Sequence, residues 1–212
     1  MTFLFDFDGT LVDSMPAFSA LMLRILDDYS IKYDSETVKI ITPLGYRGTA
    51  EYYTEQLGLP ESVPALIEKM NSLAKHDYEN VIPEKEGVGE TLRALKAMGA
   101  SLNVLTASPH AALDPCLTRL GLMPLFDNVW SCDDFGTTKS DPNIYVLAAR
   151  ALGKEVGDVT FIDDNINAVK TAMKAGMRAF GIYDESGADF ESELKAIADG
   201  YLYKMSDLLK LL

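Results

Sequence analysis

The segment that most constrains this chain begins at residue 2, where an apolar run leads directly into two aspartates separated by one residue. An apolar run ending at Asp6 is typical of a strand that is buried in a parallel sheet. Asp8 is followed by Gly9, where the backbone can turn sharply and direct its N–H groups at an anion. Two carboxylates at such a strand end suit chemistry at phosphorus: one attacks, the other handles the proton, and a divalent cation holds both.

The alternative for this segment is an Asp-Gly turn that closes a hairpin. A hairpin accounts for Asp8 and Gly9, but it leaves Asp6 unexplained at the end of an apolar strand.

The composition limits what kind of protein this is. The chain has 212 residues, 48% of them hydrophobic, which is enough for one α/β domain with an insertion. We expect no membrane span, because no apolar run is long enough, and no signal peptide. Cys116 and Cys132 form neither a metal spacing nor a disulfide framework. These features predict a cytoplasmic protein.

The formal net charge of −13 argues against a nucleic-acid partner, because neutralising nucleic-acid phosphates requires clustered lysines and arginines. The same charge should repel a phosphorylated small molecule. If such a molecule is the substrate, its site must be locally positive through a lysine, backbone amides and a bound cation.

Residues 14–83 show helical periodicity and no strand pattern, so they predict an all-helical cap domain inserted into the chain. Residues 1–13 and 84–212 would form the core, with hinges near residues 13–14 and 81–86. Residues 43–48 interrupt the helical pattern and predict a loop. Arg47 in that loop could hold an anionic group of a substrate, and a solvated arginine is the equal alternative.

After residue 86 the chain alternates helices with strands. Together with the first strand, the predicted strands are residues 101–106, a strand within 126–132, 159–162, 178–182 and a short one at 200–203. This alternation predicts the α/β class, with a doubly wound parallel sheet. Ligands of such sheets bind beyond the carboxyl ends of the strands.

Groups that can bind a metal or a phosphate lie at the ends of four of these predicted strands. They are Asp6 and Asp8 at the first, the hydroxyl of Thr106 with the backbone amides of Ala107 and Ser108 at the second, Lys139 after the third, and Asp163 and Asp164 at the fourth. Each group has an ordinary explanation alone, such as a helix cap or a solvated cation. Their common position at one predicted sheet edge favours a single site that binds phosphate at a helix N-terminus.

The chain therefore resembles the haloacid dehalogenase (HAD) superfamily, in the branch with a helical cap that includes phosphoglycolate phosphatases and β-phosphoglucomutase-like proteins. Residues 6–10 match the first motif of the family, and Thr106 the second. Lys139, with Pro142 three residues on, matches the third, and residues 161–164 match the fourth. The resemblance covers essentially the whole chain and implies a Rossmannoid core.

The resemblance also implies roles for these residues. Asp6 would attack phosphorus and become an aspartyl phosphate, while Asp8 would protonate the leaving oxygen and later activate water. Mg²⁺ would be held by Asp6, by the backbone carbonyl of Asp8 and by Asp164, with Asp163 assisting.

For the phosphoryl group, the resemblance implies that Lys139 offsets its negative charge. Thr106, with the amides of Ala107 and Ser108, would hold its oxygens.

Three functions remain open at this point. Expulsion of a halide needs no proton, so the presence of Asp8 favours transfer from oxygen leaving groups, and a Mg²⁺-dependent phosphatase acting on a small phosphomonoester is our first prediction. A β-phosphoglucomutase-like mutase is the alternative enzyme. A non-catalytic binding module with the same fold is the third reading.

Overall fold

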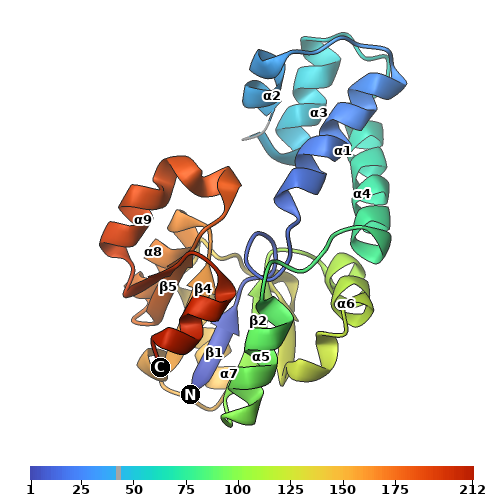
Figure 1. The fold of residues 1–212 in the computed structure, drawn as a ribbon. Coiled ribbons are helices and arrows are strands. Elements are labelled where there is room, and N and C mark those ends of the chain that lie inside the picture. Colours follow the sequence, from blue (N-terminus) through green and yellow to red (C-terminus); the bar gives the residue numbers. More distant parts are fainter. Residues whose placement is uncertain (42–43) are drawn as a thin grey trace. The chain divides into compact units, whose positions relative to one another are not determined.

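The structure is a computed structural model that describes residues 1–41 and 44–212. These residues form two compact units (Figure 1). The first unit comprises Met1–Asp13 and Pro83–Leu212, and the second comprises Ser14–Ile82. These bounds lie within one residue of the domain boundaries that the sequence predicts.

A six-stranded sheet forms the centre of the first unit. Its strands are β1 (Thr2–Phe5), β2 (Ser101–Thr106), β3 (Asn128–Ser131), β4 (Val159–Asp163), β5 (Arg178–Ile182) and β6 (Gly200–Leu202). They lie in the order β3-β2-β1-β4-β5-β6, and every neighbouring pair is parallel. The predicted fold class, a doubly wound parallel sheet, is confirmed.

The register of the sheet brings the predicted strand ends to one edge. Phe5 pairs with Val104 of β2 on one side and with Ile162 of β4 on the other. The N–H of Asp6 continues this ladder, donating to the carbonyl of Ile162 across 2.9 Å. The residues that follow β1, β2 and β4 are therefore neighbours in space, as a parallel sheet requires.

Helices cover both faces of the sheet (Figure 1). The α-helices of this unit are α5 (Val88–Ala97), α6 (His110–Arg119), α7 (Asn143–Ala151), α8 (Ile166–Lys174) and α9 (Glu191–Ile197). Short 3₁₀ helices are η2 (Met123–Leu125), η3 (Cys132–Phe135), η4 (Val156–Asp158), η5 (Glu185–Phe190) and η6 (Met205–Lys210). Helix α5 packs with η6 on one face, whereas α7 and α8 lie on the other.

The core between the sheet and α7 and α8 also supports the site. Tyr145 of α7 is fully buried and meets Phe161 of β4 edge to face, with ring centroids 5.1 Å apart. Its hydroxyl donates to the carbonyls of Lys139 and Ala168. A buried aromatic residue thus holds the backbone of the loop that carries Lys139.

The predicted elements near the C-terminus differ from the observed ones. The sequence pattern predicts one helix over residues 187–198 and a last one over residues 206–211. In the structure η5 precedes α9 in the first range, and the 3₁₀ helix η6 occupies most of the second. The side chain of Asp184 accepts a hydrogen bond from the N–H of Ser186 and so caps the earlier start of η5. Helices this short are often 3₁₀.

The second unit consists of helices alone among its described residues. They are α1 (Met15–Asp28), α2 (Ser35–Ile41), α3 (Gly45–Glu55) and α4 (Val63–Asn80). Their core is apolar, and the buried Tyr53 of α3 donates a hydrogen bond to the carbonyl of Met22 in α1. Pro at the first turn of α1 and of α4 suits a helix start.

The predicted loop around Arg47 is wrong in its described part, because α3 begins at Gly45 and includes Arg47. Residues 42 and 43 lie outside the described residues. Burial of Thr49, Ala50 and Tyr53 stabilises α3, which overrides the helix-weakening effect of its two glycines. A Cβ at Gly48 would lie only 2.9 Å from the Cβ of Leu44, so a glycine also relieves a close contact.

The two chain segments that connect the units pair with each other within the first unit. Val12 and Glu84 form an antiparallel bridge. The N–H of Asp13 donates to the carbonyl of Pro83, and that of Lys85 to the carbonyl of Leu11, both across 3.0 Å. Part of the predicted hinge at residues 81–86 is therefore held by backbone hydrogen bonds.

Among the described residues, no helix has both the length and the apolar character that a membrane crossing requires.

Candidate active site

Asp6 is the centre of the site. It follows β1 directly, and its side chain is almost completely buried. The ammonium group of Lys139 forms an ion pair with Oδ1 of Asp6. The predicted nucleophile and the predicted lysine are thus in direct contact.

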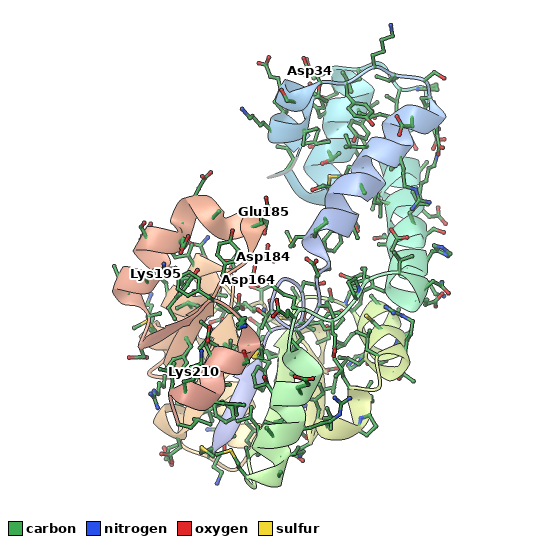
Figure 2. All side chains as sticks on the ribbon, in the orientation of Figure 1. Asp34, Asp164, Asp184, Glu185, Lys195 and Lys210 are labelled. Carbon is green, nitrogen blue, oxygen red and sulfur yellow. The ribbon has the colours of Figure 1, made fainter. Side chains whose placement is uncertain are left out.

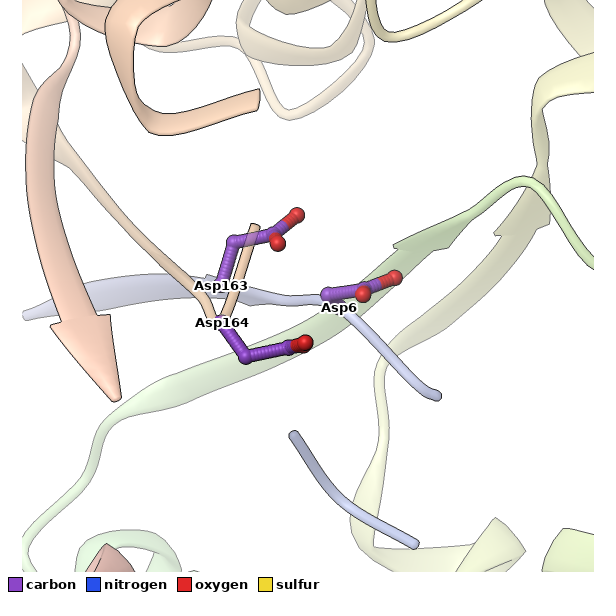
Figure 3. A group of neighbouring side chains, drawn as sticks. All are labelled: Asp6, Asp163 and Asp164. Atoms are coloured by element: carbon purple, nitrogen blue, oxygen red, sulfur yellow. The ribbon is translucent and has the colours of Figure 1, made fainter. Parts of the chain in front are cut away.

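Asp163 and Asp164, at the end of β4, bring two more carboxylates to Asp6 (Figure 3). One oxygen from each of the three side chains lies within 4.8 Å of the others. The structure therefore brings together three of the predicted metal ligands, from strands that are adjacent in the sheet.

The crowding of these carboxylates changes their protonation. Burial, together with the negative charge of Asp163, raises the pKa of Asp6 well above its ordinary value, although Lys139 acts in the opposite direction. Burial and the charges of Asp163 and Asp184 raise the pKa of Asp164 to about 7. A divalent cation would offset this repulsion, because it stabilises the ionised form of each carboxylate.

Lys139 is the only positive side chain that contacts this cluster in the part of the chain that the structure describes. Besides Asp6, its Nζ donates to Oδ2 of Asp163 across 2.9 Å. Burial alone would lower the pKa of Lys139, but Asp163 and Asp6 outweigh it and raise this pKa. Lys139 therefore stays charged and ties the end of β4 to the end of β1.

Asp164 has different partners from Asp163. Its Oδ1 accepts a hydrogen bond from the hydroxyl of Thr10 across 3.0 Å. Gly9 has a φ of +73° and approaches the same carboxylate so closely that a Cβ would lie 2.6 Å from its Oδ2. The turn after β1 thus needs glycine for both its conformation and its packing.

Asp8 contacts the loop that follows β2. The hydroxyl of Ser108 donates to Oδ2 of Asp8 across 2.5 Å. The N–H of Ser108 donates to the hydroxyl oxygen of the buried Thr106 across 3.0 Å, which folds Thr106, Ala107 and Ser108 into a tight turn. Binding of phosphate by these three residues stays a prediction.

His110 begins α6 and links this helix to η3. Its Nδ1 lies 2.9 Å from Oδ1 of Asp114, and its Nε2 lies 2.9 Å from Oδ2 of Asp134 in η3. Hydrogen bonds with Asp114 and Asp134 raise the pKa of His110. The imidazolium form can therefore connect the segment after β2 with the segment after β3.

Three residues near the site were given no role by the sequence analysis. They are Thr10, whose hydroxyl contacts Asp164, and the paired Lys85 and Asp184, of which Lys85 also contacts Gly9. Asp184 follows β5, the strand next to the one that carries Asp164 (Figure 2). Asp184 follows a strand of a parallel sheet, and this position could have indicated it as a site residue. The sequence contains no pattern that indicates Lys85.

Arg47 lies in α3 of the second unit, where its side chain is 76% exposed and pairs with Glu51 across 3.8 Å. Its role in binding the substrate stays a prediction.

The chemistry of this donor set fits a hard divalent cation. Three carboxylates supply oxygen ligands. Asp163 accepts hydrogen bonds with both of its oxygens, from Lys139 and from the N–H of Asn165. Lys139 pairs with one oxygen of Asp6, and Thr10 donates to one oxygen of Asp164. Asp6 and Asp164 are thus the oxygen donors most available to a metal.

Comparison with known proteins agrees with this geometry. The family described as "Haloacid dehalogenase-like hydrolase" matches residues 3–182. This match includes the turn after β1, Lys139 and both aspartates of β4. The chain belongs to the haloacid dehalogenase-like hydrolases. The predicted family is therefore confirmed.

Relatives within the HAD-like hydrolases are named as phosphatases. The pyrophosphatase PpaX of Bacillus velezensis is 30% identical over 97% of this chain and 93% of its own length. A phosphorylated carbohydrates phosphatase of Thermotoga maritima is 26% identical over 84% of this chain and 83% of its own. The predicted enzyme class, a HAD-like phosphoric monoester hydrolase, agrees with these names.

The fold also matches solved HAD structures. A Thermotoga maritima protein provisionally named a β-phosphoglucomutase superposes with a TM-score of 0.84 and 25% identity, covering 99% of this chain and 97% of that one. Phosphatase and mutase names therefore both occur among the proteins that this HAD-like hydrolase resembles.

Proposed function

We propose that this protein is a Mg²⁺-dependent phosphatase that hydrolyses a small phosphomonoester through a phosphorylated Asp6. The observation that supports this proposal best is the contact of the buried Asp6 with Lys139. Asp6 also lies beside two further aspartates and is separated from Asp8 by a single residue of the chain. A carboxylate in such surroundings can be both a nucleophile and a metal ligand.

In this proposal Asp6, Asp164 and the backbone carbonyl of Asp8 hold Mg²⁺, with Asp163 as a supporting ligand. When bound, the cation supplies charge stabilisation for the phosphoryl oxygens and keeps Asp6 ionised. Asp163 also holds Lys139 in place, so that the ammonium group faces the charge on Asp6 and on the incoming phosphate.

The reaction has two displacements at phosphorus. In the first, an oxygen of Asp6 forms a bond to phosphorus, the ester P–O bond breaks, and the leaving oxygen takes a proton from Asp8. In the second, Asp8 takes a proton from water as the water oxygen bonds to phosphorus. The bond between Asp6 and phosphorus then breaks, which releases inorganic phosphate and restores both aspartates.

The turn of Thr106, Ala107 and Ser108 lies at the start of α6 and is proposed to bind the phosphoryl oxygens. The hydrogen bond from the hydroxyl of Ser108 to Asp8 supports a phosphate position next to the carboxylate that is proposed to transfer the proton. A hydroxyl and a helix start suit a phosphate.

The second unit is proposed to be the cap that selects the substrate, with Arg47 binding an anionic group. The relatives' names support a phosphorylated small molecule such as a sugar phosphate. A cytoplasmic location and the absence of nucleic-acid partners stay predictions.

A mutase is the second candidate, because a structural neighbour at 25% identity carries that name. A mutase would pass the phosphoryl group from Asp6 to another hydroxyl of a sugar phosphate instead of to water.

The test is a screen of phosphomonoesters, with pyrophosphate added because of PpaX, in Mg²⁺ and in EDTA. Both inorganic phosphate and isomerised sugar phosphate are measured. We expect phosphate release that requires Mg²⁺ and is lost in Asp6→Asn. Isomerised sugar phosphate without free phosphate would favour the mutase. Hydrolysis that persists in the folded Asp6→Asn protein, or no turnover of any compound, would refute the proposal.

A further inference from the structure

Lys85 makes three hydrogen bonds with one ammonium group. Its Nζ donates to the carbonyl of Gly9 across 2.7 Å, to the carbonyl of Tyr183 across 2.8 Å and to Oδ2 of Asp184 across 2.8 Å. A lysine has three N–H donors, so all of them are used. The side chain is only 19% exposed, so these bonds are largely shielded from water.

The three acceptors of Lys85 come from two different strand ends. Gly9 belongs to the turn after β1, whereas Tyr183 and Asp184 directly follow β5. The strand between β1 and β5 is β4, which ends at Asp163 and is followed directly by Asp164. Lys85 thus connects the strand ends on both sides of the proposed metal ligands.

Lys85 holds the turn after β1 at two points. Its backbone N–H donates to the carbonyl of Leu11 across 3.0 Å, in addition to the bond from Nζ to Gly9. Within the turn, the N–H groups of Leu11 and Val12 both donate to the carbonyl of Phe7. Asp8 lies inside the segment that these bonds enclose, so its position depends on them.

The same turn also contacts Asp164. Gly9 approaches the carboxylate of Asp164 with no room for a Cβ, and Thr10 donates a hydrogen bond to it. A displacement of Gly9 would therefore move the partners of Asp164 together with Asp8. Catalysis is sensitive to such shifts, since a 1 Å misplacement can lower a rate by about a hundredfold.

Asp184 completes this arrangement. Burial alone would raise its pKa, but hydrogen bonds from Lys85 and Ser186 hold this pKa below its ordinary value. Both the N–H and the hydroxyl of Ser186 donate to Oδ1 of Asp184. The acceptor for Lys85 is thus ionised and fixed in position.

We propose that Lys85 is a positioning residue for the proposed reaction: it fixes the turn at Gly9 and thereby the reactive positions of Asp8 and Asp164. This inference rests on the proposed function for the roles of Asp8 and Asp164. The competing interpretation is that Lys85 only neutralises Asp184 and stabilises the fold.

Two substitutions separate these interpretations. Lys85→Met removes the bonds to Gly9, Tyr183 and Asp184 at nearly constant side-chain size. Asp184→Asn removes the ion pair but leaves Lys85 its two carbonyl acceptors. Lys170→Met is the control, since Lys170 forms an exposed ion pair with Glu193 in the same unit. For each protein, kcat and KM are measured with p-nitrophenyl phosphate at saturating Mg²⁺, and the urea midpoint of unfolding is measured without substrate.

For a positioning residue we expect the urea midpoint to fall in both Lys85→Met and Asp184→Asn, whereas kcat separates them. In Lys85→Met, kcat should fall by about a hundredfold with little change in KM. In Asp184→Asn, the loss of kcat should be at least about tenfold smaller than in Lys85→Met, because the bonds from Lys85 to Gly9 and Tyr183 remain. In Lys170→Met, kcat should stay within about threefold of the unmodified protein. A loss of kcat in Asp184→Asn as large as that in Lys85→Met would overturn the inference, as would an unchanged kcat in Lys85→Met.

Lys85→Arg keeps the test decisive if Lys85→Met does not fold. Arginine retains the ion pair with Asp184, but its planar guanidinium cannot direct donors at the same two carbonyls. We expect a urea midpoint near that of the unmodified protein and a kcat at least about tenfold lower. If the unmodified protein hydrolyses the ester and Lys85→Arg has the same kcat, the inference is overturned. If the unmodified protein hydrolyses no phosphomonoester, the proposed function itself has failed.

Discussion

The hydroxyl of Ser108 donates a hydrogen bond to Oδ2 of Asp8, and so joins the loop after β2 to the turn after β1. Through this bond, a residue that the sequence indicated only as a phosphate ligand also orients the proposed acid and base. We expect Ser108→Ala to lower kcat about fivefold, which corresponds to one hydrogen bond of roughly 1 kcal/mol, with KM nearly unchanged.

Steady-state kinetics with p-nitrophenyl phosphate checks this expectation. Ser108→Thr is the matched control, because it restores a hydroxyl donor and should recover most of kcat. A rise in KM without a change in kcat would indicate that Ser108 serves the phosphate alone.

Asp163 and Asp164 should respond differently to loss of charge. Asp164→Asn removes an available metal ligand, so we expect Mg²⁺ affinity to fall at least about tenfold while the stability of the metal-free protein is kept or raised. Asp163→Asn breaks the pair between the fully buried Asp163 and the largely buried Lys139, so the free energy of unfolding should fall by about 3 kcal/mol. Calorimetric titration of Mg²⁺ and urea unfolding measure the two effects. The opposite order of metal affinities would exchange the roles of these neighbours.

His110 should make stability depend on pH. Its pKa lies above its ordinary value of 6.5 because of Asp114 and Asp134, so folding favours the protonated ring. The resulting stabilisation is complete below pH 6.5 and is lost as the pH rises through the higher pKa of the folded state. His110→Gln should therefore cost stability at pH 6, by less than about 1 kcal/mol because the pairs are partly exposed, and nearly nothing at pH 9.

Urea unfolding of both proteins at the two pH values tests this prediction. His76→Gln is the control, since the ring of His76 contacts the amide of Asn80 instead of a carboxylate. An equal cost of His110→Gln at pH 6 and at pH 9 would contradict it.

Arg47→Ala should lower kcat/KM for an anionic natural substrate by more than about tenfold, which is the effect of one lost charged hydrogen bond. The effect on p-nitrophenyl phosphate, which has no second anionic group, should be small. Lys75→Ala is the matched control, because Lys75 and Glu79 also form an (i, i+4) pair at 3.8 Å in the second unit. Equal losses for both substrates would point to packing of α3 instead.

The strands and the cluster of Asp6, Lys139, Asp163 and Asp164 could be predicted because each signal is local. An apolar run ends at each aspartate, and the rule for parallel sheets then brings these ends together. A parallel sheet also required only the alternation of strands with helices. The order of its strands, β3-β2-β1-β4-β5-β6, was not predicted. The resemblance to a family added roles for residues that the sheet had already grouped.

Other contacts could not be predicted because they depend on tertiary structure. Lys85 reaches Gly9 and Tyr183 across 76 and 98 residues of sequence from a polar segment without periodicity. Arg47 lies in a helix because buried neighbours stabilise α3, which the two glycines around it do not indicate. The bond from Ser108 to Asp8 depends on the angle of a side chain, about which spacing contains no information.

The antiparallel bridge between Val12 and Glu84 has a consequence for how such a chain can change over time. Because Asp13 and Pro83 are joined by a hydrogen bond of 3.0 Å, the chain leaves the first unit and returns to it at one place. Residues Ser14–Ile82 therefore act as a loop of the first unit whose two ends are joined by these hydrogen bonds. The entropy cost of closing a loop grows only slowly with its length. A segment of another size or sequence could replace Ser14–Ile82 without moving a strand. The insertion point is thus a place where evolution can exchange whole modules while the aspartates stay as they are.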